Sequence, residues 1–375
     1  MNSLEIQTVK TRRERRTFLT FPWKIYKNDP NWVPPLLPDR RKLIDPRQGV
    51  FFKRGEAEFF IARKNGQVVG TICAAEDPVT NKVREQQECM FGFFEYIEDY
   101  QVFEALVHQV RDWAQNRGLR ALLGPFNLDY ENGYGVLIEG RERPAALMCG
   151  HTPPFYQGFM EKFGFQPGRA DNLAFYIDPS APGIARIARL AARMRERSKV
   201  VIRSVDFNRW DEEVDIIHSL LLRSLAYLPG SIPWDRDALE ASLRPFRKIA
   251  DPEMILFAEV GGEAVGWLPG IPNLNEILIH VNGLRYPWDY LRLLWHQRRQ
   301  PEGLSLKSVV LLPDYWKTGI AVIMFDEIIR RALASGYKWG DLSLTSEDNP
   351  NAPVVYDHMG GEIYKRYRVY RLELT

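Results

Sequence analysis

A strand, a short loop and a helix follow one another near the C-terminus in an order that can bind an anion. The stretch runs from Val309 to Ala321, where an aliphatic run ends at a proline and the loop closes on Gly-Ile-Ala. The residues from Val322 to Ser335 then predict a helix. The first N–H groups of a helix have no partner within it and lie at its positive end. A pyrophosphate fits there, and Gly319 would let the backbone approach it without a Cβ in the way.

A second pattern follows at a fixed distance. Asn349, Ala352, Tyr356 and Gly360 are spaced by three, four and four residues. With the first stretch, this pattern resembles the GCN5-related N-acetyltransferases (the GNAT superfamily), over roughly Val200 to Leu374. The resemblance implies acetyl-CoA or another acyl-CoA as co-substrate, with its pyrophosphate at the loop.

The resemblance assigns the coenzyme to residues of the loop and its flanks. Trp316 and Lys317 depart from the family pattern, which has Arg or Gln and then Gly at these places. Trp316 removes a polar side chain from the phosphate site, whereas Lys317 adds a cation near it. An ordinary strand-to-helix turn is the alternative interpretation. The residues expected to bind coenzyme are Leu311, Leu312, Trp316, Lys317, Thr318, Gly319, Ile320, Ala321 and Asn349.

Tyr356 is the expected catalytic side chain. Attack of an amine on a thioester expels a thiolate, and a phenol can protonate it, although pKa values of about 10 and about 8.5 make full transfer slightly uphill. A tyrosine packed between helix and sheet is the alternative. A general base is needed as well, and the sequence does not choose among Asp341, Glu347, Asp348 and His358.

The two halves of the chain show the same order of predicted elements. Strands at 57–63 and 67–73 flank an Asn-Gly pair typical of a type I′ hairpin, and strands at 254–260 and 263–268 flank Gly-Gly. A strand, a helix and another strand follow each hairpin. The pattern predicts a mixed α/β (α+β) chain of tandem GNAT-like lobes, each a mixed sheet flanked by helices.

The lobes are predicted to be unequal. We expect an N-terminal degenerate lobe at 1–183, a linker helix at 184–199 and a C-terminal lobe at 200–375 with a helical insertion near 273–300. Where the first lobe should carry a phosphate loop it has Glu95–Gln101, whose three acids would repel phosphates. That lobe either shapes the acceptor site or is purely structural. The whole chain also resembles a branch of two-lobed GNAT-like proteins, through 29–35, 124–127 and 364–370.

Composition narrows the class of protein. Hydrophobic residues make up 45% of the 375 residues, and the formal net charge is +2, so the case for nucleic acid is weak. Cys73, Cys89 and Cys149 lie in apolar runs without metal-binding spacing, which indicates free thiols in a reducing compartment. We find no metal site, secretory signal or membrane span, and expect a cytoplasmic protein that has no membrane partner.

Three functions fit these patterns. The first is an acyl-CoA-dependent N-acyltransferase that moves an acetyl or other acyl group to the amine of a small molecule or peptide. The second is a non-catalytic protein that binds acyl-CoA or another small ligand on the same fold. The third is an aminoacyl-tRNA-dependent transferase, for which the basic clusters 10–16, 193–199 and 296–299 would bind tRNA. The acceptor, the acyl chain and the oligomeric state stay open.

Overall fold

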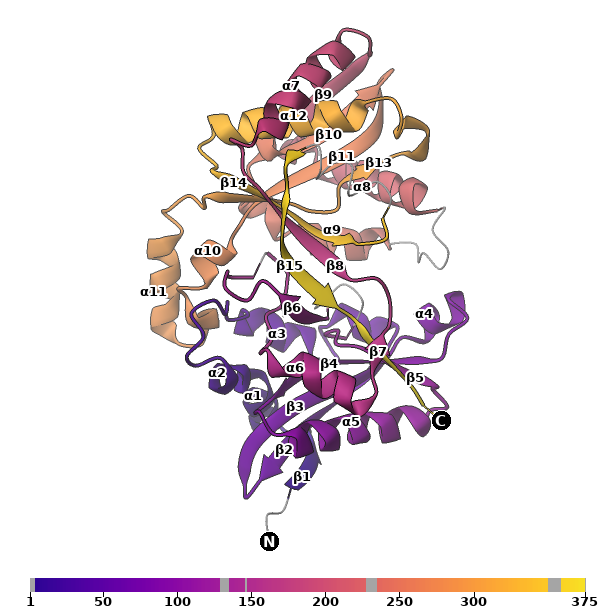
Figure 1. Cartoon of the computed structure of the whole chain (residues 1–375), viewed down its shortest axis with the longest axis vertical. Helices are drawn as coiled ribbons and strands as arrows, with labels where there is room; N and C mark the ends of the chain where they lie inside the picture. The colour runs from indigo at the N-terminus through magenta and orange to yellow at the C-terminus, as the bar shows by residue number, and fades with distance from the viewer. Residues whose placement is uncertain (1–3, 129–134, 146, 227–234, 350–358, 375) are drawn as a thin grey trace. The chain divides into compact units, whose positions relative to one another are not determined.

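The computed structural model describes residues 4–128, 135–145, 147–226, 235–349 and 359–374. They form two compact units, each with its own sheet (Figure 1). The first contains 1–172, 277–298 and 365–375, and the second contains 173–276 and 299–364. The units are therefore not contiguous in sequence, whereas the predicted division at 183 and 200 was. The segment from residue 184 to 199 lies wholly within the second unit.

The first unit is built on a seven-stranded sheet. Successive residues of strand β2 (Glu56–Lys64) belong to hydrophobic clusters on opposite faces of the sheet. Phe60 and Ala62 pack with α5, whereas Phe59 and Ile61 pack with the N-terminal helices. Both faces are covered, which explains the nearly continuous apolar runs of these strands. In order, the strands are β1 (Leu4–Thr8), β2 (Glu56–Lys64), β3 (Gln67–Glu76), β4 (Glu88–Tyr96), β5 (Ala121–Gly124), β16 (Tyr370–Glu373) and β7 (Gln166–Pro167).

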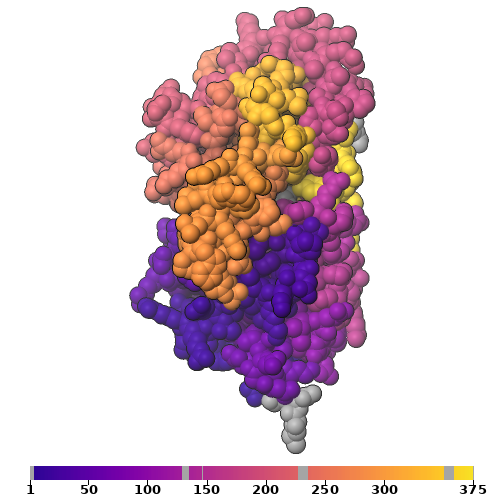
Figure 2. Space-filling model, turned by 90° about the vertical axis from the view of Figure 1, so that its left-hand side faces the viewer, coloured from indigo at the N-terminus to yellow at the C-terminus, as the bar shows by residue number. Residues whose placement is uncertain are grey.

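Helices and the chain's last strand complete this unit. β16 lies between β5 and β7, so the C-terminus ends in the N-terminal sheet (Figure 1). The segment 277–298 packs on the N-terminal helices, and the Trp23 indole donates to Asn282 Oδ1 at 2.7 Å; Figure 2 shows this segment (orange) against the indigo N-terminal residues. The helices are α1 (Arg12–Thr20), α2 (Pro22–Ile25), α3 (Leu37–Leu43), η1 (Val50–Lys53), α4 (Pro78–Val83), α5 (Tyr100–Gln115), α6 (Phe155–Phe163), η5 (Asn282–Leu284) and α11 (Pro287–His296), and β6 (Val136–Glu139) pairs with Arg366–Arg368.

The second unit has a mixed sheet in which β12 and β14 run parallel and the β9–β10–β11–β12 ladder is antiparallel. In order, its strands are β15 (Glu362–Arg368), β8 (Asn172–Ile177), β14 (Trp339–Ser346), β12 (Gly303–Leu306), β11 (Glu263–Pro272), β10 (Ile255–Val260) and β9 (Val200–Ser204), with β13 (Val310–Leu311) on β11. Its helices are α7 (Pro182–Arg195), η2 (Phe207–Arg209), α8 (Trp210–Leu225), α9 (Arg236–Leu243), η3 (Phe246–Lys248), η4 (Pro252–Met254), α10 (Asn275–Leu278), η6 (Pro313–Tyr315) and α12 (Ile320–Ala334). Two mixed sheets flanked by helices confirm the predicted fold class.

One predicted strand is interrupted. The sequence predicts a strand over 307–312, but the structure has β12 and β13 with a break between them, where Ser308 has φ +50°. The first unit has a counterpart in β4, where Phe93 has φ +45°. A non-glycine residue in this region marks a bulge that changes the strand's direction.

Candidate functional site

The predicted anion-binding loop joins β13 to α12. Gly319 precedes the helix with φ +83°, a conformation that glycine adopts without strain. Its carbonyl accepts the N–H of Ile323 at 3.2 Å. The N–H groups of residues 320 to 322 come before this bond, at the end of the helix where intrahelical partners are lacking. The helix start has the geometry that the sequence predicted.

Side chains of the loop divide into core and surface. Leu312 and Ile320 are 2% and 3% exposed, so they could reach a coenzyme only through their backbone. Trp316 is 40% exposed, and its indole N–H donates to the Leu311 carbonyl at 2.8 Å. The indole is thus held against its own loop. Lys317 and Asn349 are exposed, and Thr318 Oγ1 donates to the Tyr315 carbonyl at 2.7 Å.

Met194 lies over Gly319, a contact that the sequence did not predict. A Cβ built on Gly319 would lie 2.3 Å from the Met194 sulfur. The Met194 thioether therefore occupies the space beside Gly319 that a ligand would need in order to reach the backbone. A methionine end is flexible and can move aside. No sequence pattern links residues 194 and 319, because their proximity depends on how α7 packs on α12.

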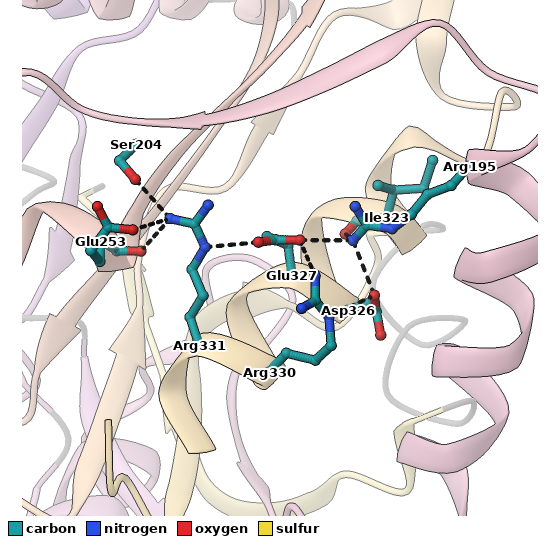
Figure 3. Close-up of polar contacts among 8 residues, drawn as sticks. All are labelled: Arg195, Ser204, Glu253, Ile323, Asp326, Glu327, Arg330 and Arg331. Atoms are coloured by element: carbon teal, nitrogen blue, oxygen red, sulfur yellow. Dashed lines mark hydrogen bonds and ion pairs between the residues drawn. The ribbon is translucent and has the colours of Figure 1, made fainter. Parts of the chain in front are cut away.

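Charged side chains fix α12 against its neighbours (Figure 3). Arg195 of α7 donates to Asp326 Oδ2 at 3.0 Å and to Glu327 Oε2 at 2.9 Å. Arg331 bonds Glu327 Oε1 at 2.8 Å, Glu253 Oε2 at 2.7 Å and the hydroxyl of Ser204 at 2.7 Å. These contacts hold α12, and with it the loop at its start, in one place.

The strands beside the loop separate at a polar cluster. β12 and β14 pair in parallel up to Leu306 and Leu342, and in the described residues β13 then pairs with β11. Asp341 is fully buried there. It accepts from Ser343 Oγ at 2.7 Å, from Tyr364 Oη at 2.8 Å and from Lys307 Nζ at 3.3 Å. Both carboxylate oxygens are engaged, so the geometry favours a structural role for Asp341.

The other candidate bases are not brought into this cluster. Glu347 and Asp348 are exposed, and Asp348 accepts from Ser346 Oγ at 2.6 Å. Tyr356 and His358 lie outside the described residues, so their roles stay predictions. In the described part of the chain no three His, Cys, Asp or Glu side chains gather as a metal site.

A small apolar pocket, open to solvent, lies between α12 and the sheet of the second unit. Ile328, Ile329 and Leu333 line it from α12, and Leu304 and Leu342 line it from the strands. Such a lining suits a hydrocarbon group. The sequence predicted α12 but not the pocket, since a void depends on packing between distant segments.

Comparison with known proteins decides the family of this region. Residues 219–360 match the model of the acetyltransferase (GNAT) family. This segment is a GNAT domain. The GNAT domain contains the loop, α12 and the separating strands, as the sequence resemblance implied, and GNAT proteins transfer acyl groups.

Relatives and solved structures match over the full length. The chain is 28% identical over 379 residues to a bacterial ceramide synthase of Caulobacter vibrioides, covering 99% of this chain and 98% of that protein. It is 27% identical to the protein YghO of Escherichia coli, covering 98% and 95%. A tandem GNAT protein from the clavulanic acid pathway has the same fold, with TM-score 0.58, 13% identity and coverage of 100% and 99%. A GCN5-related N-acetyltransferase of Sphaerobacter thermophilus gives TM-score 0.54, 12% identity and coverage of 99% and 96%.

No helix among the described residues is long and apolar enough to cross a bilayer.

Proposed function

We propose that the chain is an acyl-CoA-dependent N-acyltransferase that transfers a long-chain acyl group to an amine. The start of α12 carries the proposal: a left-handed Gly319 precedes unpaired helix N–H groups beside two strands that separate. The pyrophosphate would bind the N–H groups of residues 319 to 321. The Met194 thioether would move aside to admit it.

The acyl chain is argued from the pocket and from one relative. The lining of the pocket is almost wholly apolar, which suits a hydrocarbon. Burial of each methylene contributes about 0.8 kcal/mol, so a long chain would bind there much more tightly than an acetyl group. A relative that matches 99% of this chain is named a ceramide synthase.

The reaction needs two proton transfers. The amine nitrogen attacks the thioester carbon, an amide bond forms, and the carbon–sulfur bond breaks. The leaving thiolate takes a proton, for which we propose Tyr356, and the amine gives one to a base.

Calorimetry with acetyl-CoA and palmitoyl-CoA tests the proposal. We expect wild type to bind both and Gly319→Glu to lose both. Gly336→Glu is a matched control, because Gly336 is also left-handed (φ +86°) and ends the same helix, with open space around it. Leu333→Trp should weaken palmitoyl-CoA binding and leave acetyl-CoA binding unchanged. If wild type bound neither coenzyme, the proposal would be refuted; binding without turnover would favour the non-catalytic alternative.

A further inference from the structure

The first unit has a carboxylate that accepts hydrogen bonds from two tyrosines and is not part of the proposed coenzyme site. Glu95, near the end of β4, is half-buried. Its Oε2 accepts from Tyr26 Oη at 2.8 Å and from Tyr156 Oη at 3.0 Å. In the described residues, hydrogen bonds to this side chain reach Oε2 alone, which leaves Oε1 available for a ligand.

Hydrogen-bond directions around Glu95 suit two protonation states. Tyr156 Oη accepts the Tyr96 N–H at 3.1 Å, so its own hydrogen is directed to the carboxylate. Tyr26 Oη lies 2.8 Å from Glu95 and 2.9 Å from the His151 carbonyl. It can donate to an ionised Glu95, or accept from a protonated Glu95 and donate to that carbonyl. Taking up a proton therefore leaves no polar group unpaired.

The surroundings are aromatic, and the titratable pair of His151 and Asp29 lies beside Tyr26, with His151 Nε2 and Asp29 Oδ2 2.8 Å apart. Trp32 stacks on Tyr26 with ring centres 4.9 Å apart. Arg40, 5.4 Å from the centre of the Phe93 ring, is the cation that acts on Glu95. Burial raises the pKa of Glu95 to about 7, against the two tyrosine bonds and Arg40, which lower it.

We propose that Glu95 and its tyrosines form an amine-binding site in which the Glu95 carboxyl group and a primary amine share one proton. The choice of an amine rests on the proposed function, which needs one as acceptor. The site itself rests only on the geometry of the first unit.

Calorimetric binding of n-octylamine from pH 5 to 9 tests this site. For wild type we expect the association constant to rise about tenfold per pH unit below about pH 7 and to level off above it, because ligand and site must share one proton. Glu95→Gln should bind at least tenfold more weakly without pH dependence, and Glu98→Gln, an exposed neighbouring carboxylate, should behave as wild type. 1-Octanol should show no pH dependence.

Absent octylamine binding, or equal binding by Glu95→Gln, would overturn the amine site. Acetyl-CoA binding by Glu95→Gln is measured in parallel and should be unchanged. A negative result for the amine site can therefore be told apart from a negative result for the coenzyme site at Gly319.

Helix α11 of the first unit exposes an apolar face, which is an independent observation. Asp289, fully buried, accepts the Tyr286 N–H at 2.9 Å and caps the start of the helix. Arg292 and Arg298 are exposed on or just after the helix, and Arg292 Nη1 lies 3.5 Å from Asp289 Oδ1. Exposed fractions on this helix are 53% for Trp288, 47% for Tyr290, 68% for Leu291, 54% for Leu294 and 55% for Trp295.

We propose that α11 lies on the surface of an anionic lipid bilayer. Tryptophan and tyrosine favour the boundary between headgroups and hydrocarbon, and arginines beside them attract anionic lipids. A second copy of the chain fits less well, because an isologous contact would bring the arginines of both copies together. Figure 2 shows the helix (orange) on the surface of the molecule.

Co-sedimentation with phosphatidylcholine vesicles, with and without one quarter phosphatidylglycerol, tests this surface. We expect binding that needs the anionic lipid, a loss of tenfold or more in Leu291→Gln/Leu294→Gln, and about fivefold for each of Arg292→Gln and Arg298→Gln. Val201→Gln, at a site 59% exposed in the second unit, should bind as wild type. The proposal is wrong if binding is absent or survives the leucine changes, or if those changes instead dissociate a dimer seen by light scattering.

Discussion

The cluster around Asp341 gives a stability prediction that can be worked from distances. Lys307 is 12% exposed and Asp341 is 0% exposed in their side chains, and the ion pair measures 3.3 Å. Asp341→Asn leaves the lysine charge buried without a counter-charge and keeps only one oxygen for two hydroxyl donors. Breaking a buried pair from one side costs about 3–5 kcal/mol. We expect a loss of that size in the free energy of unfolding.

Lys307→Met is the matched change on the other side. It removes the cation, but Ser343 Oγ and Tyr364 Oη still donate to Asp341 at 2.7 and 2.8 Å. The carboxylate is then buried without a counter-charge, and these two hydrogen bonds keep the loss at the lower end of the range for a broken buried pair, about 3 kcal/mol. In the double variant no charge is left unpaired, so its loss should fall short of the sum by about 1–3 kcal/mol.

Urea unfolding of wild type, the two single variants and the double variant measures this coupling. Circular dichroism and the slope of free energy against urea check that the native state is retained. Additive losses within about 0.5 kcal/mol would show that the lysine and the carboxylate do not interact, and the reasoning from the 3.3 Å distance would be refuted.

Three further predictions concern other parts of the chain. Met194→Ala should strengthen acetyl-CoA binding severalfold, because it uncovers Gly319 before α12. Met194→Leu keeps the side-chain volume and should not strengthen binding. Weaker acetyl-CoA binding by the alanine variant in calorimetry would contradict this prediction. Glu95 has a pKa of about 7 in the native state, above its ordinary value, so its contribution to stability is present at low pH and is lost as pH rises to about 7. Relative to Glu95→Gln, wild type should lose about 2–3 kcal/mol of unfolding free energy between pH 4 and pH 8. Parallel curves of unfolding free energy against pH for the two proteins would refute this prediction. Burial raises the pKa values of Cys73 and Cys89, the latter to about 12, so only half-exposed Cys149 should react quickly with a thiol reagent in the native protein; mass spectrometry of the labelled residues decides.

Local patterns in the sequence predicted the elements that depend on neighbouring residues. The Asn65-Gly66 pair forms a hairpin with φ +53° and +77°, as an Asn-Gly turn requires. The strand, loop and helix around Gly319 were predicted because a helix start needs only nearby residues. Side chains that come together from distant segments were not predictable. Met194 reaches Gly319 from α7, and Tyr364 reaches Asp341 from another strand.

The sequence also did not predict which strands and segments lie side by side, because these pairings join residues far apart in the chain. A helical insertion was predicted near 273–300, with Gly283 as a stop and Pro287 near a helix start, and the structure has helices α10 and α11 there. The place of the segment 277–298 in the first unit depends on contacts such as the Trp23–Asn282 hydrogen bond, across 259 residues. β16 likewise joins β5 through pairs such as Tyr370 with Gly124. Neither pairing leaves a signal in one sequence, because a strand's pattern shows which face is buried and not which strand lies beside it.

The same bulge stands beside different side chains in the two units. Two residues after the bulge, the first unit has Glu95 and the second has Val310. In the second unit an apolar strand leads to a glycine and a helix start, which suits an anionic coenzyme. In the first unit the carboxylate is enclosed by tyrosines where that loop is missing, so a phosphate would be repelled and an amine accepted. If the duplication kept the bulge, the side chains next to it are enough to separate a coenzyme site from an acceptor site on one architecture.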